Sequence, residues 1–199
     1  VYELVGVVES TDRLPELFQR GVIDQALVLF GMPEAVFADI GITRDGSLVD
    51  DYFDILLRYR DKRVHLKGGY FFRQPVPEYA LFGKRGTFLK TRSDVQEAQL
   101  DNGMMPDDPA YGREPDEAAG RLFTDDTDRS RAREIRSPRG NYMAFFDALY
   151  GAIAHGDAEP VTATDGLRVM EIIDAAFRSN TTGRLVNTGY ESAREAGSS

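Results

Sequence analysis

Hydrophobic positions in the first part of the chain recur with the period of an α-helix. Between residues 13 and 30 they fall three or four positions apart, and the run ends at Gly31, with Pro33 just beyond it. This pattern predicts a helix over residues 13–30, with Thr11-Asp12 as its N-cap region. Because apolar side chains cover more than half of its circumference near its end, we expect that helix to be largely buried. The β-rich run VYELVGVVE before it, residues 1–9, predicts a short strand.

The stretch from residue 35 to residue 91 has the pattern of a sheet. Runs of β-forming residues are separated by turns, among them Arg60-Asp61-Lys62 and the segment 83–86, whose glycines permit positive φ. We expect five strands here, at 35–43, 51–59, 63–73, 78–82 and 87–91. The second and third strands would form one hairpin and the last two another. The sheet should therefore be an open, mostly antiparallel meander rather than a set of βαβ units.

The rest of the chain combines an acidic segment with two helices. Residues 101–132 hold nine acidic and four basic residues with little periodicity, which predicts a solvated loop. Apolar periodicity predicts helices over 141–155 and 161–179, the second with Thr164 as its N-cap. A short strand and a frayed tail would follow, at 184–186 and 188–199. These elements together predict an α+β fold with helices packed on one face of an open sheet.

Composition limits the classes of function. With 199 residues, of which 42% are hydrophobic, the chain can form one domain with its own core. Its net charge of −9 makes it a poor binder of nucleic acid or anionic lipid. It has no cysteine and only two histidines, which excludes thiolate chemistry and argues against a metal centre. It has no long apolar run and no signal-peptide pattern, so we expect a cytoplasmic protein without a membrane span.

Few residues stand in a pattern that predicts chemistry. Neither glycine-rich nucleotide-binding motif is present, and there is no G-x-S-x-G nucleophile motif. His65 lies within a predicted strand and His155 at a predicted helix end, positions that favour packing and capping. Asp24 is the exception, because it lies in the middle of a helix that should be mostly buried. An exposed stripe on that helix would explain Asp24 equally well.

Several separate segments resemble the C-terminal domain of the Gfo/Idh/MocA family, the glucose-fructose oxidoreductase and inositol dehydrogenase group. In the family's order and spacing they are GVIDQALVLFGMPEAVFADI, DDYFDILLRY, RVHLKGGYFF, PEYALFGKRGTFLK, DVQEAQLDNGMMPDDP and GNYMAFFDALYGAIAHGDAEPVTATDGLRVMEIIDAAFRS. The resemblance covers residues 20–187 and implies a domain with an open mixed sheet. That domain would supply the substrate wall and commonly an oligomer contact, in enzymes that oxidise or reduce sugars, cyclitols and related polyols with NAD or NADP.

The chain departs from the family pattern in two ways. Residues 1–19 resemble a remnant of a Rossmann strand and helix, without the glycine-rich turn or the E-K-P segment that carries the family's catalytic Lys. The family's helix begins D-x-G-x-H-x-x-D, but here Gly21 stands at the His position and Leu17 at the first Asp position, so Asp24 alone is kept. Dehydrogenation requires a base near the alcohol. We therefore expect no catalytic residue, no bound NAD(P) and no activity from this chain alone.

Two functions compete. In the first, the chain is the substrate-binding and oligomerisation domain of an NAD(P)-dependent oxidoreductase. The candidate substrate-binding residues are Asp24, Gln25, Lys67, Arg73 and Tyr142, and the family resemblance adds Glu9 and Ser10 as cofactor contacts near the adenosine ribose. In the second, the chain is a non-catalytic module that self-associates through an apolar sheet face. That face would be made by Phe53, Ile55, Leu57, Val64, Leu66, Tyr70 and Phe72.

Both functions predict a homodimer or a larger assembly, since helices can cover only one face of the sheet. A third possibility, a cofactor-free hydrolase or lyase, would use Asp24 with His65. No metal is expected in any of them.

Overall fold

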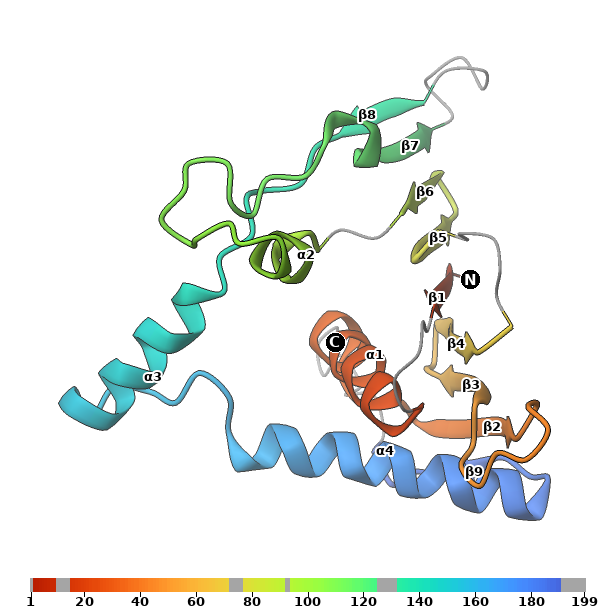
Figure 1. Ribbon diagram of the computed structural model, residues 1–199. Coiled ribbons are helices and arrows are strands. Elements are labelled where there is room, and N and C mark those ends of the chain that lie inside the picture. The colour runs from red at the N-terminus through yellow and green to blue at the C-terminus, as the bar shows by residue number, and fades with distance from the viewer. Residues whose placement is uncertain (1, 10–14, 72–76, 92–93, 125–131, 191–199) are drawn as a thin grey trace, which may run out of the picture.

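The computed structural model describes residues 2–9, 15–71, 77–91, 94–124 and 132–190. Within them the strands form one nine-stranded sheet, in the order β8-β7-β6-β5-β1-β4-β3-β2-β9 (Figure 1). In chain order the strands are β1 (Tyr2–Glu9), β2 (Ala35–Gly41), β3 (Tyr52–Arg58), β4 (Lys62–Gly69), β5 (Tyr79–Gly83), β6 (Gly86–Lys90), β7 (Gly120–Thr124), β8 (Arg133–Ile135) and β9 (Val186–Asn187). The helices are α1 (Pro15–Phe30), α2 (Gln96–Asp101), the short 3-10 turn η1 (Asp116–Ala118), α3 (Met143–His155) and α4 (Ala163–Thr182).

β1 is an interior strand of this sheet. It runs parallel to β4 and antiparallel to β5, with Val5 opposite His65 on one side and Ala80 on the other. All other pairings are antiparallel. The α+β fold with an open, mixed and mostly antiparallel sheet is therefore confirmed. The meander expected from the sequence is interrupted, because β1 separates β4 from β5.

The position of β1 bears on the expected division of the chain. Residues 2–9 lie in the same sheet as the strands that follow, and α1 runs without a break across the expected boundary between residues 19 and 20. The division of the chain at residues 19 and 20 stays a prediction, as does the descent of residues 1–19 from a Rossmann strand and helix.

α1 and α4 pack on one face of the sheet and close the core. Alternate residues of β3 and β4 point into the core, because successive side chains of a strand lie on opposite faces of the sheet. The core strand residues include Phe53, Ile55, Leu57, Val64 and Leu66, which pack with Val22, Ile23 and Ala26 of α1 and Ile172 and Ala176 of α4. The expectation that the first five residues form an uncovered apolar face is wrong, because the helices cover them.

The end of α4 completes the edge of the sheet beside β2. The buried Ser179 hydroxyl accepts a hydrogen bond from Ala38 N, and the side-chain amide of Asn180 pairs with both N and O of Ile40 at 2.9 Å. β9 pairs only with Ala35 and Val36. The two polar side chains thus satisfy backbone groups of β2 that lie beyond the end of β9.

The N-cap of α4 lies two residues before the predicted one. Thr162 is the N-cap, and its hydroxyl accepts from Asp165 N while the Asp165 carboxylate accepts from Thr162 N. This reciprocal pair is a capping box. The choice of Thr164 as N-cap was wrong because Asp165, three residues after Thr162, is the partner that the motif needs.

The acidic segment expected to be a solvated loop is more ordered than predicted. It contains part of α2, η1 and β7, and β7 pairs with β6 and β8 to extend the sheet. Tyr111 is only 1% exposed. The carbonyl of its neighbour Gly112 accepts a hydrogen bond from Gly140 N. This bond joins the middle of the acidic segment to the residues that precede α3.

α3 stands away from the sheet (Figure 1). It ends at Gly156, whose φ of +74° favours glycine. Most of its large apolar side chains are exposed: Met143, Phe145, Phe146, Leu149, Tyr150 and Ile153. In the part of the chain that the structure describes, no helix combines the length and the hydropathy that a membrane crossing requires.

Candidate functional site at the α1–β5 junction

Of the two predicted substrate residues of α1, Gln25 lies at the junction with β5 and Asp24 precedes it on the helix. Asp24 and Gln25 are both exposed, in agreement with an exposed stripe on that helix. The Tyr79 hydroxyl of β5 donates a 2.7 Å hydrogen bond to Gln25 Oε1. Burial, and then the charge of Glu78, raise the pKa of Tyr79. The phenol therefore stays a neutral donor at physiological pH and fixes the orientation of the Gln25 amide.

Tyr142 lies at a second junction, between α2 and α3. Its hydroxyl donates to the Asp94 carboxylate, and its backbone N donates to Gln96 Oε1. Asp94 also accepts from the backbone N of Gln96 in the first turn of α2. Burial, followed by the hydrogen bond and charge of Asp94, raises the pKa of Tyr142. Tyr142 is thus tied into the structure by its own hydrogen bonds.

A buried ion pair holds the region between the two junctions. Lys90 Nζ lies 2.8 Å from Glu114 Oε2 and donates to the carbonyl of Ala118 at 2.7 Å. Lys90 stands opposite Tyr79 in the β5–β6 register. Asp94 follows Lys90 by four residues, so Tyr79, Lys90 and Asp94 come from the same end of these strands.

Sequence reasoning missed these three residues, although each has a signal. Lys90 is a lone cation at the end of an apolar strand, GTFLK, and Asp94 precedes α2 in the D-x-Q-E pattern of a helix start. Tyr79 opens β5. Their contacts could not be read from sequence because the partners named above, apart from Gln96 beside Asp94, lie more than 20 residues away.

Lys67 lies on the opposite face of the sheet from Asp24 and Gln25. It alternates with the buried Leu66, and its Nζ is 2.7 Å from Asp54 Oδ2. His65 Nδ1 is 3.7 Å from Asp54 Oδ1 on that same face. The predicted residues therefore do not converge on one pocket. The hypothesis that Asp24 acts with His65 is wrong, because the sheet separates them.

Of the remaining predicted positions, only Glu9 is among the described residues. Arg73 and Ser10 lie outside the described residues, and so does Phe72 of the proposed apolar face. Glu9 is described as the last residue of β1, opposite Gly69.

The two positions at which the sequence departs from the family motif both lie on α1. Gly21 is exposed, and Leu17 lies one turn before it. A Cβ added to Gly21 would meet no atom within 4 Å. The place of the family's His is therefore open space, one turn before Asp24.

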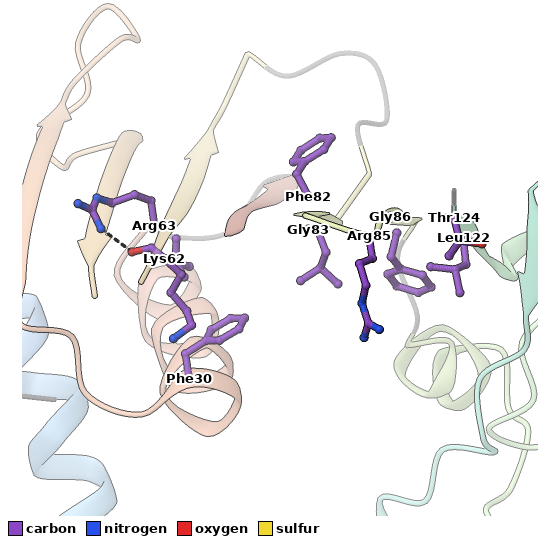
Figure 2. Close-up of a pocket in the computed structure, with 12 residues that line it drawn as sticks. Phe30, Lys62, Arg63, Phe82, Gly83, Arg85, Gly86, Leu122 and Thr124 are labelled. Atoms are coloured by element: carbon purple, nitrogen blue, oxygen red, sulfur yellow. Dashed lines mark hydrogen bonds between the residues drawn. The ribbon is translucent and has the colours of Figure 1, made fainter. Parts of the chain in front are cut away.

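A separate cavity of about 360 Å³ lies at the other end of β5, beside the β5–β6 turn (Figure 2). Its lining includes Phe30, Val64, Leu81, Phe88 and Leu122, with Lys62 and Arg85 at the rim. An apolar lining offers few partners to the hydroxyls of a polyol. None of the predicted substrate residues lines it.

Among the described residues, no group of three or more His, Asp or Glu side chains could hold a metal ion. What the α1–β5 junction offers instead is an exposed carboxylate, a fixed amide and a neutral phenol. These groups can hydrogen-bond the hydroxyls of a substrate.

The comparison with known proteins decides the family. The model of an oxidoreductase family, C-terminal alpha/beta domain, matches residues 22–188. The chain belongs to the Gfo/Idh/MocA oxidoreductases. It corresponds to their C-terminal domain, and it is related to NAD(P)-dependent dehydrogenases that act on CH–OH donors.

Relatives of this Gfo/Idh/MocA domain are recognisable in both sequence and structure. The scyllo-inositol 2-dehydrogenase (NADP(+)) IolW of Bacillus subtilis is 35% identical over 165 residues, which are 83% of this chain and 46% of IolW. The solved structure of yvaA from Bacillus subtilis has a TM-score of 0.84 at 30% identity and covers 93% of this chain and 57% of its own. A structure from Bacteroides fragilis has a TM-score of 0.80 at 35% identity, with the same two coverages. The chain thus spans about half the length of the relatives it matches.

Proposed function

We propose that these residues form the substrate-binding and self-associating half of an NAD(P)-dependent oxidoreductase for a sugar, cyclitol or related polyol. The observation that carries the proposal is the family match over residues 22–188, together with the similarity to IolW, whose name gives a cyclitol substrate and NADP. The cofactor and the base that removes the proton would come from residues beyond these 199, because no nucleotide-binding motif stands among them.

The α1–β5 junction is the proposed substrate wall. Gln25 is held by Tyr79, and the exposed Asp24 lies beside it on α1. A fixed amide and a carboxylate recognise adjacent hydroxyl groups well, because each accepts a hydrogen bond that a polyol can donate. Lys67 is not part of this wall, since it lies across the sheet with Asp54.

α3 is the proposed docking surface for the nucleotide-binding part. Ile153 is 78% exposed and Tyr150 65%. A helix this apolar, standing apart from its own sheet, normally packs against another unit. The relatives are about twice as long as this chain, so they have a further part of sufficient size.

The test is complementation between separate chains. The part of IolW that the match does not cover would be mixed with this chain, and NADP-dependent oxidation of scyllo-inositol would be followed.

Binding would be measured in parallel by 15N NMR of this chain with scyllo-inositol, myo-inositol and glycerol. The proposal predicts polyol-induced shifts at the backbone amides of Asp24 and Gln25. These shifts should be reduced in Gln25→Glu and kept in Asn102→Asp, the same amide-to-carboxylate change at an exposed position after α2. Shifts absent with every polyol, with the fold intact, would contradict it.

Self-association without catalysis is the second candidate. The sheet face away from α1 and α4 carries the exposed Phe37, with Leu56 opposite it in the β2–β3 register. The same face also carries Asp54, His65 and Lys67. A second copy would cover both the apolar and the charged groups.

A further inference from the structure

The apolar cavity beside the β5–β6 turn is built from a row of side chains that crosses the sheet. In register, Leu81 of β5 stands opposite Phe88 of β6, and Phe88 stands opposite Leu122 of β7. Val64 of β4 extends the floor, and Phe30 at the end of α1 forms a wall. α1 packs on β4 and β1. The part of the row that lies beyond β1 therefore remains accessible as the floor of the cavity.

The rim of the cavity is cationic. Lys62 and Arg85 extend in the same direction on either side of it (Figure 2). Lys62 Nζ is 2.6 Å from Asp61, but no partner of Arg85 is found among the described residues. None of the twelve lining residues is acidic, although the chain carries a net charge of −9. An apolar floor under a positive rim is complementary to a molecule with an apolar body and an anionic head.

We propose that this cavity binds a medium-chain carboxylate, with its hydrocarbon chain on the Leu81–Phe88–Leu122 row and its head group at Arg85. Neighbouring strands lie about 4.8 Å apart, so the floor from β4 to β7 extends for about 19 Å. The volume of about 360 Å³ is within the range of small-molecule sites. The site is separate from the α1–β5 junction and does not depend on the function proposed there.

The test uses decanoate, with decyltrimethylammonium as the cationic counterpart, each below its micelle-forming concentration. The amides of Gly83 and Gly86 line the cavity and report on it in 15N NMR spectra. Those of Gly151 and Gly156 report on α3, whose exposed apolar surface is the competing site. Decanoate should shift Gly83 and Gly86 in a saturable way, and the cationic amphiphile should bind there roughly tenfold more weakly.

Two variants test the contacts. Arg85→Gln should weaken decanoate binding about fivefold, whereas Lys84→Gln, the same charge change at the neighbouring exposed position, should change it less than about twofold. Leu122→Trp should abolish binding by filling the cavity. Decanoate that shifts only the α3 amides would overturn the proposal. So would equal binding of the two amphiphiles, or equal effects of the Arg85 and Lys84 changes.

Discussion

Lys90 and Glu114 form an ion pair that is almost completely buried. Their side chains are each 7% exposed, and Nζ lies 2.8 Å from Oε2. The pair joins the end of β6 to the segment before η1. It therefore holds the region that carries Asp94 and Tyr142 against the sheet.

Removal of one partner should leave an uncompensated buried charge. We expect Lys90→Met to lower the free energy of unfolding by about 3 to 5 kcal/mol. The matched control is Asp174→Asn, which breaks the exposed Arg178–Asp174 pair and should cost less than about 0.5 kcal/mol. Urea unfolding followed by circular dichroism measures both. Equal losses in the two variants would show that the buried pair is no more important than a surface pair.

Asp51 is the second buried acid with a structural role. Its carboxylate accepts hydrogen bonds from N and Oγ1 of Thr43 and from N and Nε of Arg44. Burial alone would raise the pKa of Asp51, but these hydrogen bonds outweigh it and lower the pKa from 3.8 to about 2. The folded protein therefore binds this proton more weakly than the unfolded chain does.

The stabilisation by Asp51 should be complete above about pH 5 and disappear as the pH falls toward 2. Asp51→Asn should lower the free energy of unfolding by about 1 to 3 kcal/mol at neutral pH, because the amide NH₂ faces donors. The difference between the two proteins should shrink below pH 4. Chemical unfolding at a series of pH values tests this, and a difference that stays constant down to pH 2.5 would contradict it.

Two glycines should respond in opposite ways to the same change. Gly21 lies in α1 with no atom within 4 Å of an added Cβ, whereas a Cβ at Gly68 would meet the Phe53 ring at 2.4 Å. Gly21→Ala should therefore raise the free energy of unfolding by about 0.5 to 1 kcal/mol. Gly68→Ala should lower it by roughly 1 to 3 kcal/mol. The pair is compared by thermal unfolding, and a destabilised Gly21→Ala protein would mean that the site at the family's His position is not open.

Self-association through the open sheet face can be separated from association through α3. Phe37→Glu adds a charge to the open face, and Ile153→Glu adds one to α3. If the open face is the contact, the first change should weaken a dimer by at least about tenfold, and the second should leave it unchanged. Light scattering over a range of protein concentrations measures this. A dimer lost only in the Ile153 variant would place the contact on α3.

The sequence predicted the local elements well and their long-range partners poorly. The helices over 13–30, 141–155 and 161–179 and the two central hairpins follow from periodicity and turn residues, which act over short distances. The insertion of β1 between β4 and β5 does not, because pairing across more than 50 residues leaves no local pattern. β7 and β8 were missed since each is short and lies beside an acidic stretch.

The candidate site shows the same division. The helix pattern alone identified Asp24 and Gln25 as candidate substrate residues. It could not identify Tyr79, the hydrogen-bond partner of Gln25, because the two residues are 54 positions apart. Lys67 was grouped with them because the sequence does not state which face of a strand meets the helices. Only the burial of Leu66 and Val64 under α1 and α4 settles that question.

The proposed function requires that these residues supply the substrate side of an oxidoreductase without a cofactor site of their own. Calorimetric titration of the purified chain with NAD, NADH, NADP and NADPH tests this most directly. We expect no heat of binding and no change in the fluorescence of either reduced nucleotide. Micromolar binding of any one of the four would contradict it and would place a nucleotide site within this chain or between two copies of it.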